Sequence, residues 1–298
     1  MLLILQVFPR LFARKVLAAR ELLAAALENY FLNKGHESGS ALIQARYNHS
    51  IEWKTSINDI ARFELGGTFA VLPNTVNTSF WIIFHIFSDP VVHNDVRNEL
   101  TQLIKSGPDY NSIDIADVKS KCPILLSTLQ EVLRFHTNGN SVRVALEDHM
   151  LASQYLIKKN CTIMIPSAVQ HTDPSIWGPT VSEFNHKRFL RSQGKRLPNP
   201  VAFRGFGGGT TLCPGRNFAT TEILAFATMM VMRFDVEVVG GEWVMPSTKN
   251  AGAQATVPQP DVDAEVRMMP RKMEKEWRFE LSGSEKWMEL VVEDMVEK

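Results

Sequence analysis

The sequence predicts a mainly α-helical protein with a small β part. Long apolar segments with helical periodicity recur along the chain, and the longest spans residues 56–88. Short runs in which β-branched residues alternate with other residues lie between them, as in residues 141–148, and these predict strands of small sheets. The 298 residues are 45% hydrophobic and 21% charged, so the chain can bury a substantial core.

Charge and cysteine usage exclude several classes of protein. Lys and Arg total 32 and Asp and Glu total 32, so nothing in the net charge favours nucleic acid or an anionic membrane as the main partner. The three cysteines, Cys122, Cys161 and Cys213, are far apart and form no C-x-x-C pair. That spacing argues against a disulfide scaffold and a structural zinc site, and it suits a reducing compartment. The chain has no apolar run near the roughly 18 residues of a membrane-spanning helix.

The N-terminal stretch has two interpretations. Its first acidic residue is Glu21, which is compatible with a cleaved targeting peptide. Residues 10–33 also carry an uninterrupted helical pattern, and this favours an ordinary amphipathic helix.

The segment 56–88 predicts a helix through the centre of the protein, because it is apolar on most faces after Leu65. Pro73 removes one helical hydrogen bond and predicts a kink or a widened turn. Such a defect beside Asn74 and Thr75 can hold a water or a diatomic ligand. A kink that serves only packing is an equal alternative.

Further helices follow. Asp89 and Pro90 predict a helix start, with an end near Ile104, and the next helix begins near Pro123. On that second helix Glu131 and Arg134 are three residues apart, so they share a face among apolar neighbours. The turn-rich residues 171–179 predict a surface loop.

The stretch FRGFGGGTTLCPGRNF, residues 203–218, carries the strongest chemical signal. Its glycines let the backbone approach a flat cofactor closely. Cys213 and Pro214 precede a long apolar run that predicts a buried helix, and the N-terminus of a helix favours a thiolate. The stretch therefore predicts a site that presents one anionic sulfur to a metal. The alternative is a structural cysteine after a flexible loop.

The spacing Phe206-x-x-Gly209-x-x-x-Cys213-x-Gly215 resembles the haem-ligand signature of the cytochrome P450 superfamily. Glu131-x-x-Arg134 and the segment 184–189, with Arg188, resemble two further signatures in the same order. The resemblance implies the C-terminal portion of the cytochrome P450 fold: a central long helix, the Glu-x-x-Arg helix, the cysteine loop with its following helix, and small sheets. It implies a partial haem-thiolate domain over residues 1–282, with a C-terminal tail at 283–298.

The resemblance also implies roles for individual residues. Cys213 would supply the axial thiolate to the iron of haem b (heme b), and Thr75 with Asn74 would deliver protons to bound oxygen. Glu131, Arg134 and Arg188 would form a buried network that holds the cysteine loop. The expected haem contacts are Arg143, Phe206, Gly209, Gly215 and Arg216. The expected substrate-facing residues are Phe69, Ala70, Val71, Val142, Ala253, Gln254 and Ala255. Without the resemblance, Arg143 reads as a solvated strand residue.

Within the family, Asn74-Thr75 with Phe80-Trp81 looks most like the sterol 7α-hydroxylase and prostacyclin synthase branch and its fungal secondary-metabolism relatives. Asn74 stands where most monooxygenases have an acid, His186 where proline is common, and Thr211 where a basic residue is usual. The chain is also much shorter than a full-length member, which predicts an N-terminal truncation that removes the membrane anchor and early helices.

The implied function is a haem-thiolate monooxygenase that inserts one oxygen atom of O2 into a lipophilic small molecule: a steroid, terpenoid or polyketide-like compound of secondary metabolism. The implied partner is an NADPH-dependent flavoprotein reductase, at the cytoplasmic face of the endoplasmic reticulum membrane. One alternative is a haem-thiolate isomerase or dehydratase that acts on a peroxide without a reductase. The other is a truncated, non-catalytic remnant.

Overall fold

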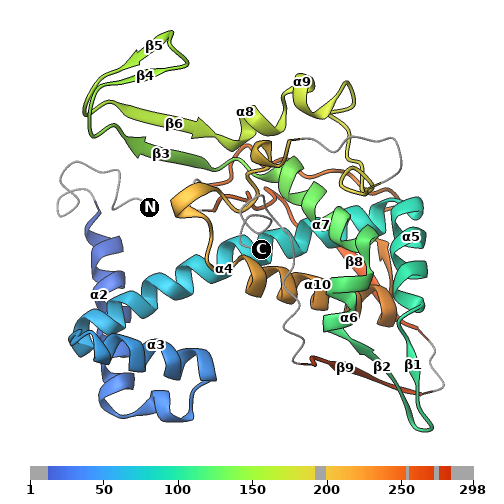
Figure 1. The fold of residues 1–298 in the computed structure, drawn as a ribbon. Coiled ribbons are helices and arrows are strands. Elements are labelled where there is room, and N and C mark those ends of the chain that lie inside the picture. Colours follow the sequence, from blue (N-terminus) through green and yellow to red (C-terminus); the bar gives the residue numbers. More distant parts are fainter. Residues whose placement is uncertain (1–12, 192–198, 253–254, 272–274, 283–298) are drawn as a thin grey trace. The chain divides into compact units, whose positions relative to one another are not determined.

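The longest element of the protein is helix α4, Ile57–Ser88, which contains Pro73 (Figure 1). The structure is a computed structural model and describes residues 13–191, 199–252, 255–271 and 275–282. It divides into two units, residues 1–73 and 74–298. The boundary falls beside Pro73, where the sequence predicts a defect, and α4 carries its helix assignment through that point.

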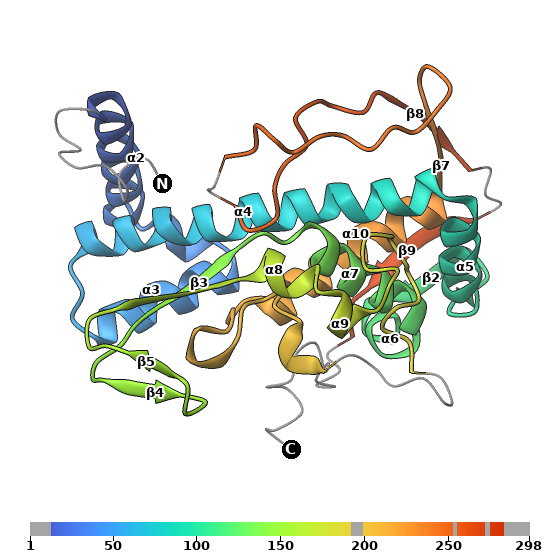
Figure 2. The same cartoon turned by 90° about the horizontal axis from the view of Figure 1, so that it is seen from above.

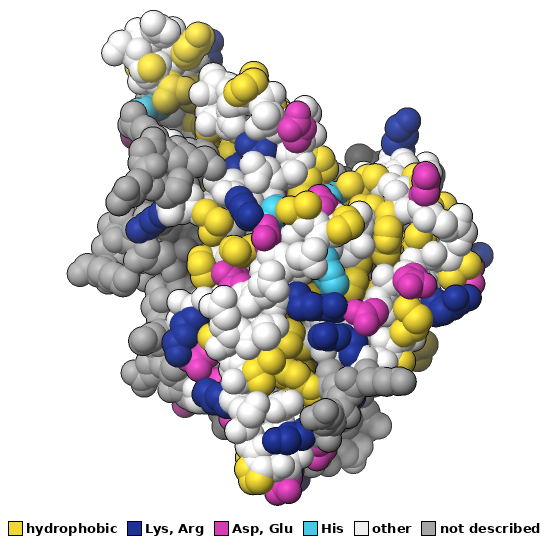
Figure 3. Space-filling model, turned by 90° about the vertical axis from the view of Figure 1, so that its right-hand side faces the viewer, with side chains coloured by type: hydrophobic (Ala, Val, Ile, Leu, Met, Phe, Trp, Pro, Cys, Tyr) yellow, Lys and Arg dark blue, Asp and Glu magenta, His cyan; other side chains and the backbone are white. Residues whose placement is uncertain are grey.

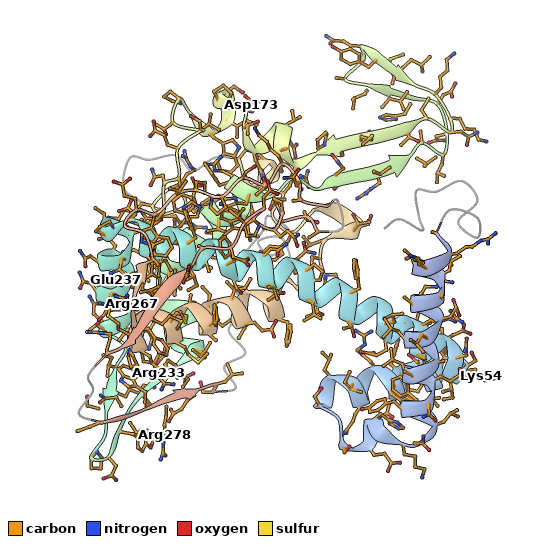
Figure 4. All side chains as sticks on the ribbon, turned by 180° about the vertical axis from the view of Figure 1, so that it is seen from behind. Lys54, Asp173, Arg233, Glu237, Arg267 and Arg278 are labelled. Atoms are coloured by element: carbon orange, nitrogen blue, oxygen red, sulfur yellow. The ribbon has the colours of Figure 1, made fainter. Side chains whose placement is uncertain are left out.

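The first unit contains α2 (Arg14–Leu32), the short 3-10 helix η1 (Gly35–Ser38), α3 (Ala41–Glu52) and the first part of α4. The predicted N-terminal helix is confirmed over the described residues of α2. The small hydrophobic core of the first unit consists of Phe31, Ile60 and Ala61. After α3 the chain turns at Lys54, whose φ of 56° lies in the left-handed region (Figure 4).

The second unit is built on α5 (Pro90–Thr101), α6 (Ile115–Lys121), α7 (Pro123–His136) and α10 (Arg216–Arg233). Helix α10 packs against the other three. The predicted start of α5 is confirmed, because the Asp89 carboxylate accepts a hydrogen bond from the backbone N–H of Val91 at 2.8 Å. The largest fully buried hydrophobic side chains of this unit are Trp81, Ile82, Ile86, Leu100, Ile113, Leu125, Leu129, Ile223, Leu224 and Met232.

Helix α5 also stabilises the ends of two other helices. The Glu99 carboxylate accepts hydrogen bonds from the backbone N–H groups of Ile124 and Leu125, at 2.8 and 2.9 Å, and so caps the N-terminus of α7. Two residues earlier, Arg97 donates to the carbonyl of Val231 at the end of α10 and to the carboxylate of Asp235. Burial raises the pKa of Glu99, against the effect of the two backbone donors.

The prediction of short strands is confirmed in part, because three antiparallel pairs form, but the predicted stretch 141–148 is a strand only as far as Val144. Strand β3 (Asn140–Val144) pairs with β6 (Thr162–Pro166), β4 (His149–Leu151) with β5 (Tyr155–Ile157), and β7 (Phe234–Val238) with β8 (Val266–Pro270). The β4–β5 hairpin lies at the far end of the β3–β6 ribbon (Figures 1 and 2). Glu237 of β7 and Arg267 of β8 are register partners and carry opposite charges across the pair (Figure 4).

A further sheet was not predicted. Its order is β1 (Lys105–Ser106), β2 (Tyr110–Asp114) and β9 (Glu276–Glu280), and β2 runs parallel to β9. The Arg278 guanidinium of β9 lies over the Tyr110 ring, 4.0 Å from its centre (Figure 4). The polar sequence around β2 resembles a connection, but it forms an antiparallel pair with the two residues of β1 and a parallel pair with β9 from the far end of the chain.

The surface agrees with the balanced composition. On the face drawn in Figure 3, basic and acidic side chains are interspersed with hydrophobic ones. In the part of the chain that the structure describes, no helix combines the length and the apolar character that a membrane crossing requires. The predicted amphipathic tail at residues 283–298 lies outside the described residues.

Candidate functional site

The cysteine loop lies between two 3-10 turns, η2 (Pro200–Ala202) and η3 (Gly209–Thr211), and the start of α10. Gly207 and Gly209 have φ values of 80° and 62°, a region that side-chain-bearing residues rarely adopt. The loop closes on itself, because the backbone N–H of Cys213 donates to the carbonyl of Phe206 at 3.0 Å. The loop thereby fixes the backbone of Cys213, and its thiol is half-buried and forms no disulfide.

Two contacts hold this loop close to its supports. A Cβ on Gly205 would lie 2.6 Å from the Phe203 ring and 2.9 Å from the Leu133 Cβ, so the loop can approach α7 only with glycine there. On the other side of the cysteine, the Arg216 guanidinium donates to the Cys213 carbonyl at 3.3 Å. The side chain of Arg216, a predicted haem contact, thus also braces the backbone of the predicted iron ligand.

Arg143 lies on β3 and reaches the same loop. Its guanidinium donates to the Thr211 hydroxyl at 2.5 Å and to the Val142 carbonyl at 2.9 Å. The threonine that replaces the family's usual basic residue is therefore a hydrogen-bond partner of the remaining arginine. The contact joins the β3–β6 ribbon to the residue two positions before Cys213.

Glu131, Arg134 and Arg188 come together in one buried cluster. The Arg134 guanidinium binds both oxygens of Glu131, each at 2.8 Å, and Arg188 Nε lies 2.9 Å from Glu131 Oε1. The side chains are almost completely buried, with Glu131 at 0%, Arg134 at 2% and Arg188 at 5% exposure. Two buried arginines on one carboxylate need further acceptors.

Backbone carbonyls provide those acceptors. Arg188 donates to the carbonyls of Trp177, Thr180 and Glu183, at 3.1, 2.8 and 3.0 Å. Arg134 donates to the carbonyl of His171 at 2.8 Å. The cluster therefore holds the chain from His171 to Arg188 in place as well as its own three members.

His171 extends the cluster to the cysteine loop, and sequence reasoning missed it. This residue ends α8 (Ser167–His171), shortly before α9 (Pro174–Trp177), and its Nε2 accepts the backbone N–H of Arg204 at 2.8 Å. Its exposure is 1%, and burial lowers its pKa to about 4, so the ring is neutral near neutral pH. The prediction of a surface loop at residues 171–179 is wrong for His171 and for Trp177, which is 5% exposed. The prediction fails because turn-forming residues indicate where the chain bends, not how deeply it is buried. Asp173 behaves as a turn residue should, because its carboxylate caps α9 (Figure 4).

His186 has a partner that its sequence position does not reveal. Its Nε2 lies 2.8 Å from a carboxylate oxygen of Asp95 on α5, and Lys187 Nζ lies 2.6 Å from the same oxygen. Hydrogen bonds from Lys187 and His186 lower the pKa of Asp95. These contacts with α5 restrain the turn before Arg188, in which His186 stands where proline is usual in the family.

Asn74 and Thr75 are adjacent on α4 and differ in their contacts. The Asn74 side-chain oxygen accepts hydrogen bonds from the backbone N–H groups of Thr256, at 2.8 Å, and Val257, at 3.3 Å. The half-buried Thr75 hydroxyl has no hydrogen-bond partner among the described residues, whereas the Thr78 hydroxyl donates to the Asn74 carbonyl at 2.7 Å. Thr75 can therefore offer its hydroxyl to a ligand, whereas the oxygen of the Asn74 side chain is already bonded.

The predicted substrate-facing residues lie on three separate stretches. Phe69, Ala70 and Val71 belong to the first unit, and all three are exposed. In the second unit Val142 is exposed and Ala255 is half-buried. Ala253 and Gln254 lie outside the described residues.

The donor set fits a haem better than a metal bound by protein side chains alone. Among the residues described, no group of three or more His, Cys, Asp or Glu side chains could hold a metal ion. Cys213 offers a single sulfur, as an iron that takes its other ligands from a porphyrin requires. A Cβ on Gly209 would meet no atom within 4 Å, and one on Gly215 would come no closer than 3.9 Å to the Cys213 sulfur. Neither glycine position is therefore filled by a neighbouring side chain.

Comparison with known proteins gives a consistent result. A family model described as Cytochrome P450 matches residues 4–264. The chain is 35% identical to cytochrome P450 monooxygenase nodJ of Hypoxylon pulicicidum over 306 aligned residues. This alignment covers 98% of this chain and 59% of that protein. The chain is 27% identical to cholesterol 7-alpha-monooxygenase of Cricetulus griseus, in an alignment that covers 88% of this chain and 56% of that protein. The crystal structure of the cytochrome P450DA heme domain covers 73% of this chain and 46% of its own, with a TM-score of 0.60 and 23% identity, and so supports the fold. The matched region thus spans 59% and 56% of the length of these two curated relatives.

Proposed function

The chain belongs to the cytochrome P450 family, and from this premise we propose that it acts as a monooxygenase that inserts one oxygen atom of O2 into a lipophilic small molecule. The observation that carries the proposal is the cysteine loop: Cys213 has a half-buried thiol, its backbone N–H donates to the Phe206 carbonyl, and it lies just before the first turn of α10. The family binds haem through a cysteine thiolate, and the predicted mainly α fold with a small β part is confirmed.

We assign the haem contacts on the basis of this loop and its neighbours. Haem with a thiolate ligand supplies the activation of O2, because electron donation from the sulfur favours O–O cleavage. Cys213 would hold the iron, and the Arg143 guanidinium, which donates to the Thr211 hydroxyl, would pair with a propionate through a charge-assisted hydrogen bond. Phe206, Gly209, Gly215 and Arg216 shape the same loop. Glu131, Arg134 and Arg188 act at a distance by holding the chain that supports it.

Thr75 is the proposed proton-handling residue. Its hydroxyl has no partner among the described residues, so it can donate to an oxygen ligand and accept from an ordered water. The Asn74 oxygen, in contrast, is occupied by two backbone N–H groups. We therefore give the proton relay to Thr75, with only the Asn74 amide nitrogen left to order water beside it.

We propose a steroid, terpenoid or polyketide-like substrate in secondary metabolism. The exposed apolar side chains of Phe69, Ala70, Val71 and Val142, and the half-buried Ala255, suit a lipophilic molecule; we keep Ala253 and Gln254 in this set on the resemblance alone. The names of the relatives point the same way, since one is a cholesterol 7-alpha-monooxygenase. The proposed electron donor is an NADPH-dependent flavoprotein reductase, at the cytoplasmic face of the endoplasmic reticulum membrane.

A second candidate is an isomerase or dehydratase that acts on a peroxide without an electron donor. One observation favours it: the neighbour of Thr75 is an amide whose oxygen binds backbone groups, so this position supplies no acid. The third interpretation, a non-catalytic remnant, is opposed by the complete Glu131, Arg134 and Arg188 cluster, whose hydrogen bonds a drifting sequence would lose.

The absorption spectrum of the dithionite-reduced protein with carbon monoxide tests the proposal. We expect a strongly red-shifted Soret band that disappears in Cys213→Ala and persists in Cys161→Ala, since Cys161 is an exposed cysteine outside the loop. Turnover only with NADPH and a reductase supports the monooxygenase, and turnover of a peroxide without them supports the isomerase. A wild-type chain that retains no haem would overturn both.

A further inference from the structure

An irregular segment, Thr256–Pro258, is held against α4 by three side chains of that helix. The Asn74 oxygen accepts the N–H groups of Thr256 and Val257 at 2.8 and 3.3 Å. The amide of Asn77 donates to the Val257 carbonyl at 2.7 Å. We call this set of contacts, together with the bond from Trp81 Nε1 to the Pro258 carbonyl at 2.9 Å, the α4 strap.

The strap follows from the helical period. Residues 74, 77 and 81 are spaced by three and four, so they lie on one face of α4 and meet consecutive residues of the irregular segment. Trp81 is 0% exposed and Val257 is 3% exposed, so the backbone at Val257 and Pro258 is shielded from water, whereas Thr256 lies at the exposed end of the segment. Because the segment belongs to no sheet, the α4 side chains take the place of a neighbouring strand as hydrogen-bond partners.

The opposite side of the segment is also fixed. The backbone N–H of Asn138, just after α7, donates to the Thr256 carbonyl at 2.9 Å. A Cβ on Gly139 would overlap the Thr256 methyl group, so glycine allows this approach. Thr256 therefore lies between α4 and the start of β3, and both its N–H and its carbonyl are bonded.

We propose that Asn74 is a positioning residue that sets the place of Ala255 and Thr256 relative to Thr75, and thereby determines which carbon of the substrate is oxidised. Asn74 precedes Thr75 on the helix, and its oxygen binds the residue that follows Ala255. One side chain thus links the proposed proton donor to the proposed substrate wall. The inference rests on the proposed function, and it gives Asn74 a task other than moving a proton.

Two substitutions separate positioning from chemistry. Asn74→Asp keeps an oxygen that can accept both N–H groups, and it supplies the acid found in most monooxygenases. Asn74→Leu keeps the approximate shape and removes the acceptor. Ser79→Ala is the matched control, because Ser79 lies five residues further along α4 and its hydroxyl makes no hydrogen bond to the described residues.

The first measurement is residue-resolved hydrogen exchange of the full haem-loaded chain, which reads the strap without any turnover. We expect the Thr256 and Val257 amides to exchange about tenfold faster in Asn74→Leu, the value for loss of one ordinary hydrogen bond. Asn74→Asp and Ser79→Ala should retain the wild-type protection. Unchanged protection in Asn74→Leu would overturn the strap, whatever the protein catalyses.

The second measurement is the ratio of hydroxylated products from progesterone, a lipophilic probe with several oxidisable positions. We expect Asn74→Leu to lose the wild-type preference and Asn74→Asp to keep it. If Asn74→Asp keeps the amide protection but shifts the ratio as far as Asn74→Leu does, the amide acts on the chemistry itself and the positioning role is refuted. If wild-type protein oxidises no substrate, the proposed function fails and the specificity role falls with it, while the exchange data still decide whether Asn74 holds the segment.

Discussion

The Nε2 atom of His171 accepts the backbone N–H of Arg204 at 2.8 Å. The carbonyl of the same histidine accepts the guanidinium of Arg134 at 2.8 Å. One buried residue therefore connects the Glu131 cluster with the loop that carries Cys213. His171 belongs neither to the Glu-x-x-Arg motif nor to the cysteine motif, yet its hydrogen bonds help to hold the loop of the predicted iron ligand in place.

Replacing His171 tests this connection. His171→Phe keeps an aromatic ring against Phe203, on which the imidazole stacks at 5.9 Å between ring centres, but leaves the Arg204 N–H without its acceptor. We expect a loss of about 1–3 kcal/mol in the free energy of unfolding and faster dissociation of haem. Urea denaturation and transfer of haem to an apo-globin measure the two effects. His149→Phe, on the exposed strand β4, is the control, and an equal effect there would refute the connection.

Two buried histidines, His85 and His171, and the half-buried His136 predict that the protein loses stability in acid. Burial lowers the pKa of His85 to about 3 and that of His171 to about 4, and it lowers the pKa of His136 as well. His85 Nε2 and His136 Nε2 lie 2.9 Å apart, so one ring must be neutral to accept the hydrogen bond. The unfolded chain takes up protons near pH 6.5, whereas the folded chain does so only at lower pH. Stability is therefore full above about pH 6.5 and falls below it.

The expected slope is up to about 1.4 kcal/mol per pH unit for each buried histidine, in the range from pH 6 to the folded pKa values. Urea unfolding at a series of pH values measures it. His171→Phe should reduce the slope by about 1.4 kcal/mol per pH unit, the contribution of one proton, and His149→Phe should leave the slope unchanged. A flat profile between pH 6.5 and 4.5 would contradict the burial of these rings.

The Glu131 cluster predicts a large effect from a small change. Glu131→Gln conserves shape but leaves Arg134 and Arg188 without their carboxylate in a buried site. We expect a loss of about 3–5 kcal/mol in the free energy of unfolding, measured by urea denaturation, together with reduced haem content. Glu37→Gln, in the exposed ion pair with Lys34, should change neither quantity, and comparable effects from both substitutions would refute the structural role.

Two glycines should respond to alanine in opposite directions. At Gly205 the added methyl would lie 2.9 Å from the Leu133 Cβ, so we expect Gly205→Ala to cost about 1–3 kcal/mol and to loosen the loop. At Gly66, inside α4, the methyl would meet nothing within 4 Å, and we expect Gly66→Ala to raise stability by about 0.5–1 kcal/mol. Thermal denaturation of both variants checks the pair, and a stabilising Gly205→Ala would refute the close approach.

The part of this architecture that local spacing determines was predictable. Fixed spacings on one helix and one loop marked Glu131, Arg134 and Cys213, and periodicity marked α4, α5 and α7. His171, Glu99 and Asn74 were not predictable as supports, because each acts by accepting backbone N–H groups from a distant segment, and such a partner leaves no trace in the sequence. Strand β2 was missed for a similar reason, since its local partner β1 has only two residues and its longer pairing is with β9, beyond residue 275.

The contacts of α5 also set an order of assembly. Glu99 and Ile124 are 25 residues apart, whereas Arg97 and Asp235 are 138 residues apart. A short loop costs less entropy to close, and a chain made on the ribosome folds its earlier segments first. Helices α5 and α7 can therefore pair while the cysteine loop is still being synthesised. The loop then packs against a helix, α7, that has already formed.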